Sequence, residues 1–308
     1  MSMRNDFIDA LVEQAALDER IVLLTADLGY TVLEKFSDKF PDRYFNVGAA
    51  EQNMLGIAAG MTASGLIPFV YSMTTFVTMR SFEFIRNGAA LHQLPVRIIG
   101  VGGGFDYGHA GPTHHGLEDI ALMRALQGVS IYCPLSNNHA QKLLANTWKT
   151  DGPIYYRISK DQIDLPNENE ISVIPGELHC VRKGENVAII GLGRCCNEAI
   201  EAADALREQG INAAVYGAYS LSPSPEKALV EALNGIKTCV VLEDHSINGG
   251  LGSLVAEGIA ENRLGCKLIR AGSTGTPKKV CADYAMLKDI NKMTTKDIVK
   301  KTLSACNN

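Results

Sequence analysis

Short runs of β-branched and other apolar residues alternate with helix-like segments along this chain, in two successive series. Helical patterns at 51–65 and 117–128 separate runs of the first series. Strands and helices that alternate in this way build parallel βαβ units, with ligands at the carboxyl ends of the strands. Five runs of the first series are typical of buried strands: 21–27, 67–72, 96–102, 129–134 and 154–158.

The second series begins after a polar segment, SKDQIDLPNENEISVIPGE, which holds two prolines and shows no sustained periodicity. A helical pattern over 195–209 and another after GGLGS alternate with strand-like runs at 187–193, 212–217, 239–244 and 266–272. The sequence thus predicts an α/β protein of two domains, each with a mainly parallel sheet flanked by helices. We place the first domain at 1–165, a linker at 166–184 and the second domain at 185–308.

Composition and charge narrow the class of protein. With 308 residues and 46% hydrophobic content, the chain can bury a large core in two soluble globular domains. The net charge is −5 and lysines and arginines form no run, so we expect neither nucleic acid nor a membrane surface as a partner. The N-terminus lacks a signal pattern, and eight cysteines without metal spacing favour reduced thiols, which predicts a cytoplasmic location.

Glu51 is the first candidate for chemistry. It lies in NVGAAEQNMLGIAAG, among small and apolar residues where a predicted strand runs into a predicted helix. Burial raises the pKa of a carboxyl group and a helix N-terminus lowers it, so the sequence leaves the sign of the shift open. On residue type alone, an acid stabilised by the helix dipole is the commoner interpretation.

The whole segment resembles the thiamine-diphosphate enzymes of the transketolase group, in which a strand ends in G-x-x-E-Q before a helix of small residues. Here it reads GAAEQN, followed by GIAAGMTASGLIPFV. The resemblance implies that Glu51 shares a proton with a ring nitrogen of the cofactor's aminopyrimidine and so activates the cofactor. YSMTTFVTMRSFEFIRN is similar to the family's aromatic segment, which implies that Phe76 stacks on the same ring.

A third segment, GGGFDYGHAGPTHHGLEDIALMR, contains GPTHH and resembles the family's loop over the substrate. The resemblance implies that His114 hydrogen-bonds the reacting two-carbon unit or relays a proton. Asp27, in TADLGYT, matches an acid near the cofactor. An ungapped count places Arg4, Thr31 and Arg157 where the family holds the sugar phosphate, and guanidinium groups suit phosphate because their planar donors engage two oxygens.

Two positions depart from the family pattern. Gly102 and Gly103 stand where the family has a histidine, and Ala110 replaces the acid before the GPTH glycine. The missing groups normally read the donor's hydroxyls and help to grip the acceptor, so we expect substrates other than the common pentose-phosphate sugars. The C-terminal region also resembles the family's third domain, and its residues 243–245 are expected to be structural or interfacial.

The family's metal signature, G-D-G with an asparagine downstream, does not occur in this sequence. That signature belongs to the diphosphate-binding domain. The resemblance therefore implies the C-terminal subunit of a split transketolase. A separate N-terminal subunit would hold the diphosphate of thiamine diphosphate through Mg²⁺ or Ca²⁺, and two copies of this chain would pair in a heterotetramer. No metal ligand is expected in this chain.

The implied activity, in carbohydrate metabolism, is transfer of a two-carbon ketol unit from a ketose phosphate to an aldose phosphate. Three alternatives stay open: the β subunit of a 2-oxoacid or acetoin dehydrogenase, an enzyme like 1-deoxyxylulose-phosphate synthase, and a non-catalytic regulatory homologue. Arg4, Thr31, Arg157 and the GPTH element favour the transketolase over the other enzymes. The intact Glu51 argues against the non-catalytic homologue.

Overall fold

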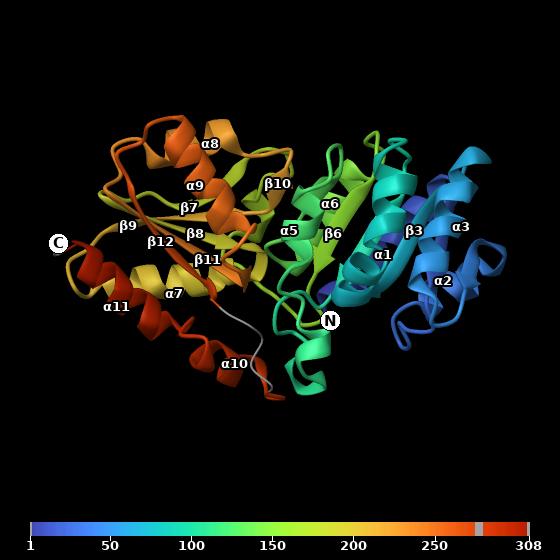
Figure 1. The fold of residues 1–308 in the computed structure, drawn as a ribbon, viewed down its shortest axis with the longest axis horizontal. Coiled ribbons are helices and arrows are strands. Elements are labelled where there is room, and N and C mark those ends of the chain that lie inside the picture. Colours follow the sequence, from blue (N-terminus) through green and yellow to red (C-terminus); the bar gives the residue numbers. More distant parts are fainter. Residues whose placement is uncertain (1, 275–279, 307–308) are drawn as a thin grey trace.

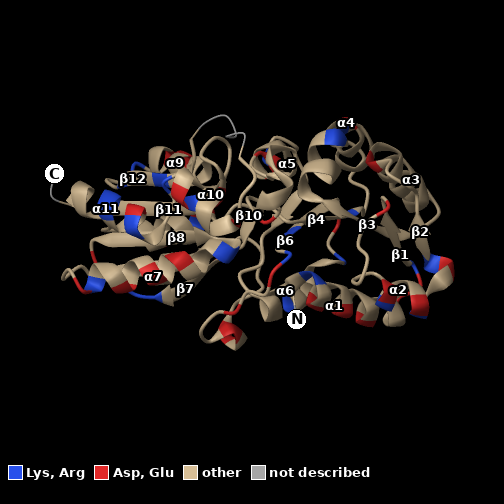
Figure 2. Cartoon of the chain, turned by 90° about the horizontal axis from the view of Figure 1, so that it is seen from below, with Lys and Arg blue, Asp and Glu red and all other residues tan. Residues whose placement is uncertain are grey.

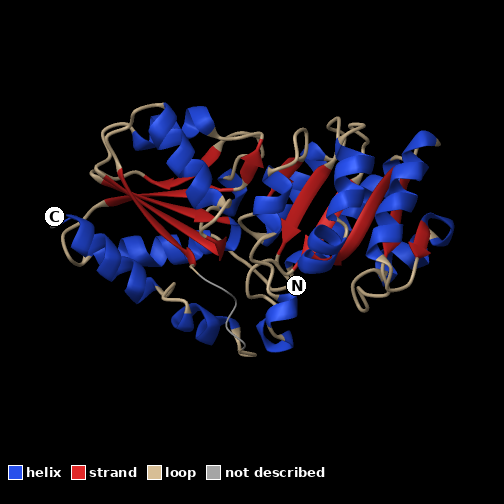
Figure 3. Ribbon diagram, viewed as in Figure 1, coloured by secondary structure: helices blue, strands red, loops and turns tan. Residues whose placement is uncertain are grey.

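The computed structural model describes residues 2–274 and 280–306, which form two α/β domains lying side by side (Figure 1). The first domain runs from blue to green in Figure 1, and the second from yellow to red. Each domain has one mainly parallel sheet with helices packed against it (Figure 3). The fold class expected from the sequence is confirmed.

The first sheet has the strand order β10-β5-β6-β4-β3-β1-β2. Strands β1 to β6 run parallel, so their carboxyl ends all point to the same edge. The registers pair Thr25 with Tyr71 and Val101 with Ile158, which brings the strand ends level with one another. These strands are β1 (Ile21–Thr25), β2 (Tyr44–Asn46), β3 (Ile67–Met73), β4 (Arg97–Val101), β5 (Ser130–Tyr132) and β6 (Ile154–Ile158).

Side chains of the first sheet alternate between two apolar layers. Leu24 and Val70 pack in the layer that includes α3, whereas Leu23 and Phe69 pack in the layer of α1 and α6. Because both faces are covered, β1 is buried along its whole length, and its sequence is a continuous apolar run instead of an alternating one. The helices are α1 (Met3–Leu17), α2 (Glu34–Lys39), α3 (Glu51–Ala63), α4 (Phe82–Phe84), α5 (Asp119–Arg124) and α6 (Asn137–Thr147).

The second sheet has the order β12-β11-β8-β9-β7, with β7 antiparallel to β9. Its strands are β7 (Leu178–Arg182), β8 (Val187–Leu192), β9 (Ala213–Ala218), β11 (Thr238–Ser246) and β12 (Lys267–Ser273). The helices of this domain are α7 (Cys196–Arg207), α8 (Glu226–Leu233), α9 (Leu251–Glu261), α10 (Tyr284–Ile290) and α11 (Thr295–Cys306).

Two short strands were not predicted from the periodicity, and one of them connects the domains. Strand β10 (Ser220–Ser222) follows β9 but pairs antiparallel with β5, at the edge of the first sheet. Strand β7 lies inside the segment 166–184 that we expected to be a linker, and its residues are only partly buried, so they carry no strong apolar pattern. The helix expected over 117–128 is shorter, because α5 ends at Arg124.

Acidic and basic residues occur on the helices of both domains (Figure 2). None of the helices within residues 2–274 and 280–306 is long and apolar enough to cross a membrane.

Candidate functional site

The residues singled out by the sequence converge on the carboxyl edge of the first sheet. Asp27 and Thr31 follow β1, Glu51 follows β2, Phe76 follows β3, and His114 lies in the loop after β4. The parallel strands fix this arrangement, because every loop that leaves their carboxyl ends emerges on one side of the sheet. This edge is where a ligand is expected in such a fold.

Glu51 is the first residue of α3 and is only 2% exposed. Its position at the helix N-terminus stabilises a negative charge there, because the first backbone N–H groups of a helix point outward. The Oε2 atom accepts a hydrogen bond of 2.7 Å from Nη1 of Arg80, whose side chain is 46% exposed. Glu51 is therefore a buried carboxylate that is paired with a partly exposed arginine.

The same arginine contacts the predicted aromatic residue. Arg80 lies over the ring of Phe76, with 4.7 Å from its Cζ atom to the ring centroid. Phe76 and Arg80 begin and end one turn of π-helix, Phe76–Arg80, which brings their side chains together. His114 contacts the Phe76 ring edge-on at 5.2 Å between centroids, and its Nδ1 lies 3.0 Å from the Thr113 hydroxyl. Glu51, Phe76, His114 and Arg80 thus form one cluster.

The loop after β1 carries the other two predicted residues of this edge. Asp27 is exposed and left-handed (φ 54°), and its carboxylate accepts hydrogen bonds from Asn46 and Tyr30. Thr31 is also left-handed (φ 66°), and its backbone N–H donates to Oε1 of Glu34. Two non-glycine residues with positive φ in a five-residue loop show that the loop is held in a strained shape by its hydrogen bonds.

Arg4, in the first turn of α1, lies beside two tyrosines. Burial raises the pKa of Tyr107, and the Arg4 cation opposes that rise. Burial raises the pKa of Tyr71 as well, again opposed by Arg4. The Nε of Arg4 is buried without a hydrogen-bond partner among the described residues. Lys160, which follows β6, places its ammonium 5.5 Å from the centre of the Tyr107 ring. Two cations therefore flank Tyr107.

Arg157, which we expected to hold the substrate phosphate, makes several contacts within the protein. Its Nε donates to Oδ2 of Asp119 at 2.8 Å, and its Nη2 donates to the carbonyl oxygens of Gly116 and Asp244. Its side chain is 9% exposed, and that of Asp119 is fully buried. The guanidinium therefore connects the first domain to the end of β11. Its Nε and Nη2 atoms already donate hydrogen bonds, which leaves few N–H groups for a ligand.

Tyr107 and Arg157 also explain the glycines that depart from the family pattern. A Cβ atom on Gly102 would collide with the Tyr107 ring, and a Cβ atom on Gly103 would collide with the Arg157 guanidinium. Gly102 has φ +75°, which any other residue adopts with strain. The space that a side chain at position 102 would need is thus filled by the Tyr107 ring.

The second domain supports the loop that carries His114. The Asp244 carboxylate accepts a hydrogen bond from the backbone N–H of Phe105, and a Cβ atom on Gly104 would collide with that carboxylate. The N–H of Ala282 donates to the carbonyl of Gly108. The loop after β4 is therefore held from two sides by the second domain, which agrees with the interfacial role expected for residues 243–245.

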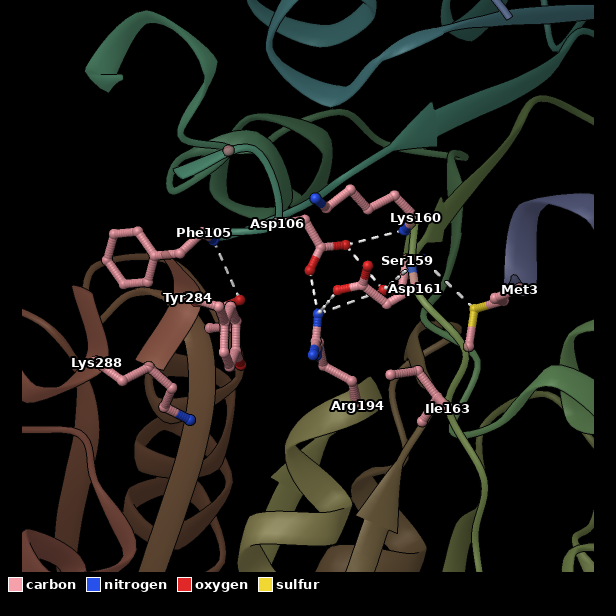
Figure 4. Close-up of polar contacts among 12 residues, drawn as sticks. Met3, Phe105, Asp106, Ser159, Lys160, Asp161, Ile163, Arg194, Tyr284 and Lys288 are labelled. Carbon is pink, nitrogen blue, oxygen red and sulfur yellow. Dashed lines mark hydrogen bonds and ion pairs between the residues drawn. The ribbon is translucent and has the colours of Figure 1, made fainter. Parts of the chain in front are cut away.

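An ion pair at the domain boundary adds to this support (Figure 4). Asp106, from the same loop, is 4% exposed and pairs with Arg194, which follows β8. The second carboxylate oxygen of Asp106 accepts hydrogen bonds from the Ser159 hydroxyl and the Lys160 N–H. The Arg194 guanidinium also lies 4.1 Å from the centre of the Tyr284 ring. The backbone at Lys160 and the loop after β4 thus share one anchor.

Buried acids and a histidine at the end of β11 complete the boundary. The Glu243 carboxylate accepts hydrogen bonds from the N–H groups of Leu251 and Gly252 at the start of α9. Burial raises the pKa of Glu243 to about 7 and that of Asp244 to about 6. Burial lowers the pKa of His245 to about 4. All three groups are buried at the end of β11, and Asp244 also contacts the first domain through the N–H of Phe105.

Three further residues at this edge were not predicted from the sequence: Arg80, Tyr107 and Lys160. Arg80 is four residues after Phe76, and a π-helical turn is not visible in an apolar pattern. Lys160 stands three residues after the arginine that the ungapped count selected. A preference for a cation beyond the end of the apolar strand over one inside it would have favoured Lys160, because strand positions in a core rarely present a free charge.

The described part of the chain contains no group of three histidine, cysteine, aspartate or glutamate side chains placed to hold a metal ion. Its eight cysteines are free.

Comparisons with known proteins cover both domains. The family model for the transketolase pyrimidine-binding domain matches residues 1–164, and that for the transketolase C-terminal domain matches residues 176–300. A solved structure described as "Split gene transketolase, inactive beta4 tetramer" superposes with a TM-score of 0.90 at 31% identity, over 99% of this chain and 98% of that one.

Three relatives show how the chain compares in length. A "Putative transketolase C-terminal section" of Methanocaldococcus jannaschii is 36% identical, over 88% of this chain and 85% of the relative. One of the subunits of an apulose-4-phosphate transketolase, from Phocaeicola vulgatus, is 32% identical over 98% of both chains. A "1-deoxy-D-xylulose-5-phosphate synthase" of Halothermothrix orenii is 35% identical, over 86% of this chain but 42% of the relative. The chain therefore belongs to the transketolase family and comprises its pyrimidine-binding and C-terminal domains.

Proposed function

We propose that this chain is the C-terminal subunit of a thiamine-diphosphate-dependent transketolase, which moves a two-carbon ketol unit from a ketose phosphate to an aldose phosphate. Membership of the family implies thiamine diphosphate. The observation that carries the proposal is the arrangement of Glu51, Phe76 and Arg80: a buried carboxylate and an aromatic face both contact one flat, nitrogen-bearing group.

The residues at this site fit the aminopyrimidine of the cofactor. That ring is flat and needs an aromatic partner for its face and a carboxylate for its ring nitrogen. The Arg80 guanidinium, which is flat and donates N–H, already uses both groups in this structure. When bound, thiamine diphosphate supplies the nucleophilic carbon that takes up and releases the two-carbon unit.

The remaining chemistry is assigned to side chains of this chain. Glu51 holds a proton at a ring nitrogen of the aminopyrimidine, and its burial strengthens that hydrogen bond because the local dielectric is low. Phe76 orients the ring from one side. His114, in contact with Phe76, is within reach of the substrate and moves a proton at its imidazole. We assign Asp27, in the loop after β1, as a polar contact near the cofactor.

The anionic end of the sugar is assigned to Arg4 and Lys160, with Thr31 as a hydroxyl donor. The buried Nε of Arg4 has no partner among the described residues, and the Lys160 ammonium lies 5.5 Å from the centre of the Tyr107 ring. A phosphate would pair with both cations through charge-assisted hydrogen bonds. Lys160 takes the place that we expected Arg157 to fill. The Tyr107 ring fills the space that a side chain at position 102 would need, and the absence of the family's histidine and acid favours a donor other than the common pentose phosphates.

A second polypeptide is part of the proposal. In this proposal a separate diphosphate-binding subunit holds Mg²⁺ or Ca²⁺, and this chain supplies the pyrimidine-binding and C-terminal domains. The similarity over 98% of a relative that is itself named as one subunit of a transketolase supports a split enzyme. We propose a heterotetramer in which two copies of this chain pair. The free thiols suit a reducing cytoplasm.

The test uses the chain assembled with its diphosphate-binding subunit. Glu51→Gln removes the carboxylate but keeps the shape, and it should lower kcat by at least about 100-fold, the usual scale of acid–base catalysis. Glu226→Gln is the matched control, because Glu226 is also the first residue of a helix but is exposed on α8. Equal turnover by the Glu51→Gln pair and the wild-type pair would contradict the proposal and favour a non-catalytic homologue.

The donor decides between enzymes that share this architecture. A ketose phosphate with an aldose acceptor should give ketol transfer, whereas use of pyruvate would identify a synthase like the relative from Halothermothrix orenii or a 2-oxoacid dehydrogenase subunit. The chain spans 98% of the transketolase subunit from Phocaeicola vulgatus and 42% of the synthase.

A further inference from the structure

Arg80 occupies the place that the proposed cofactor ring needs. Its guanidinium donates from Nη1 to Oε2 of Glu51 at 2.7 Å and lies over the Phe76 ring at 4.7 Å. The guanidinium covers the face of the Phe76 ring and reaches Oε2 of Glu51 at the same time. A cofactor ring that stacks on this face and donates to the same oxygen would need the volume that the guanidinium fills, so the two groups exclude each other there.

The burial of the two partners shows which of them can move. Glu51 is fixed in the first turn of α3, and its side chain is 3% exposed. Arg80 lies at the end of a π-helical turn, and its side chain is 46% exposed. A long side chain at the surface changes rotamer in nanoseconds, whereas a helix start packed in the core does not. Arg80 is the partner that leaves.

The pair has a physical reason to form in the subunit without cofactor. A carboxylate with so little exposure is expensive to bury alone, and a cation at hydrogen-bonding distance offsets that penalty. The Phe76 face adds a cation–π contact that keeps the guanidinium flat against the ring. Arg80 thus pairs with the Glu51 carboxylate and holds its orientation.

We propose that Arg80 is a displaceable counter-ion: it holds Glu51 and Phe76 in place until the aminopyrimidine ring of the cofactor replaces its guanidinium. This inference rests on the proposed function, because it takes Glu51 and Phe76 as the groups that bind that ring. Arg80 is a positioning residue and not a catalytic one. It also sets the apparent affinity for the cofactor, since the site must release the arginine before it accepts the ring.

The first measurement needs only the isolated chain and no cofactor. Arg80→Gln should lower the urea midpoint of unfolding at neutral pH, because Glu51 loses its counter-ion, and Arg80→Lys should restore most of it. In the Glu51→Gln background the same Arg80→Gln change should have no effect, because no carboxylate remains to be paired. Arg86→Gln is the control, because Arg86 is an exposed arginine of the next helical turn that contacts Asn87 and not Glu51.

An Arg80→Gln effect of equal size with and without the Glu51 carboxylate would overturn the inference, because the arginine would then act through other contacts.

The second measurement is equilibrium binding of thiamine diphosphate, with Mg²⁺ present, to the chain assembled with its diphosphate-binding subunit. Arg80→Gln should tighten the apparent Kd about five- to tenfold, because an empty site without its stand-in is less stable. Arg80→Lys should remain close to wild type, and Arg86→Gln should be unchanged.

The binding results distinguish a failure of the role of Arg80 from a failure of the proposed function. Weaker or equal binding by the Arg80→Gln pair, with normal binding by the wild-type pair, would overturn the inference alone and make Arg80 a direct contact of the cofactor or a bystander. If the wild-type pair binds no thiamine diphosphate, the proposed function fails, and the inference fails with it.

Discussion

Removal of the Asp119 carboxylate tests whether Arg157 is a structural residue. Asp119 is fully buried and accepts hydrogen bonds from Nε of Arg157 at 2.8 Å and from the Tyr155 hydroxyl at 2.7 Å. Asp119→Ala leaves the Arg157 charge buried without its carboxylate. Breaking one partner of such a pair destabilises a protein by about 3–5 kcal/mol. Because the whole free energy of unfolding is on the order of 5–15 kcal/mol, this loss is large.

The matched control is the exposed pair of Asp9 and Lys35, which are 30% and 51% exposed and 2.5 Å apart. Asp9→Ala should lower the free energy of unfolding by less than about 1 kcal/mol, because water already solvates both charges. Urea unfolding of both variants, followed by far-UV circular dichroism, measures the difference. Arg157→Met added to Asp119→Ala should recover part of the loss, because the unpaired charge is gone. Losses within about 1 kcal/mol of each other would refute this account of Arg157.

Three further results are expected. Lys160→Gln or Arg4→Gln should raise the KM for a phosphorylated donor about 10- to 100-fold and change kcat much less. Steady-state assays of the assembled pair measure both constants, and an unchanged KM would show that these residues do not bind the phosphate. Gly104→Ala (φ +65°) should lower the melting temperature more than Gly210→Ala (φ +79°), because only the Cβ at position 104 would collide with the Asp244 carboxylate. Equal shifts of the melting temperature would contradict this tight contact. Burial lowers the pKa of His245 from 6.5 to about 4, so the stability contributed by the neutral imidazole is complete above pH 6.5 and is lost as the pH falls through 4. In urea titrations at several pH values, His245→Gln should reduce the loss of stability at acid pH. An unaltered pH profile would refute this role of His245.

Local patterns were enough to predict most of the first domain. The strands over 21–27 and 67–72 are visible because each is covered on both faces, so nearly every residue in them is apolar. Strand β10 was not predicted, because its three residues gain their pairing from β5, which is 88 positions earlier at Tyr132 and Ser220. Short edge strands depend on such distant partners more than on their own composition.

The site also contains residues that local motifs predict and contacts that depend on distant parts of the chain. Glu51, Phe76 and His114 were found because a motif fixes their spacing, and the structure brings all three to one edge of the sheet. Arg157 was given a substrate role because an arginine at that position suits phosphate. Its actual partners, the Asp119 carboxylate and the Asp244 carbonyl, are 38 and 87 positions away and come from different domains.

The sequence by itself determined the alternation of strands and helices, the two-domain α/β class and the three motif residues, because periodicity and spacing are local properties of a chain. Only the tertiary structure decided which charges are free and which are paired. Arg80 meets a carboxylate that is 29 positions earlier, and Lys160 comes to lie beside Tyr107. Parallel strands gather loops that are distant in sequence at one edge, and the electrostatics of that edge follow from the folded neighbours of each residue.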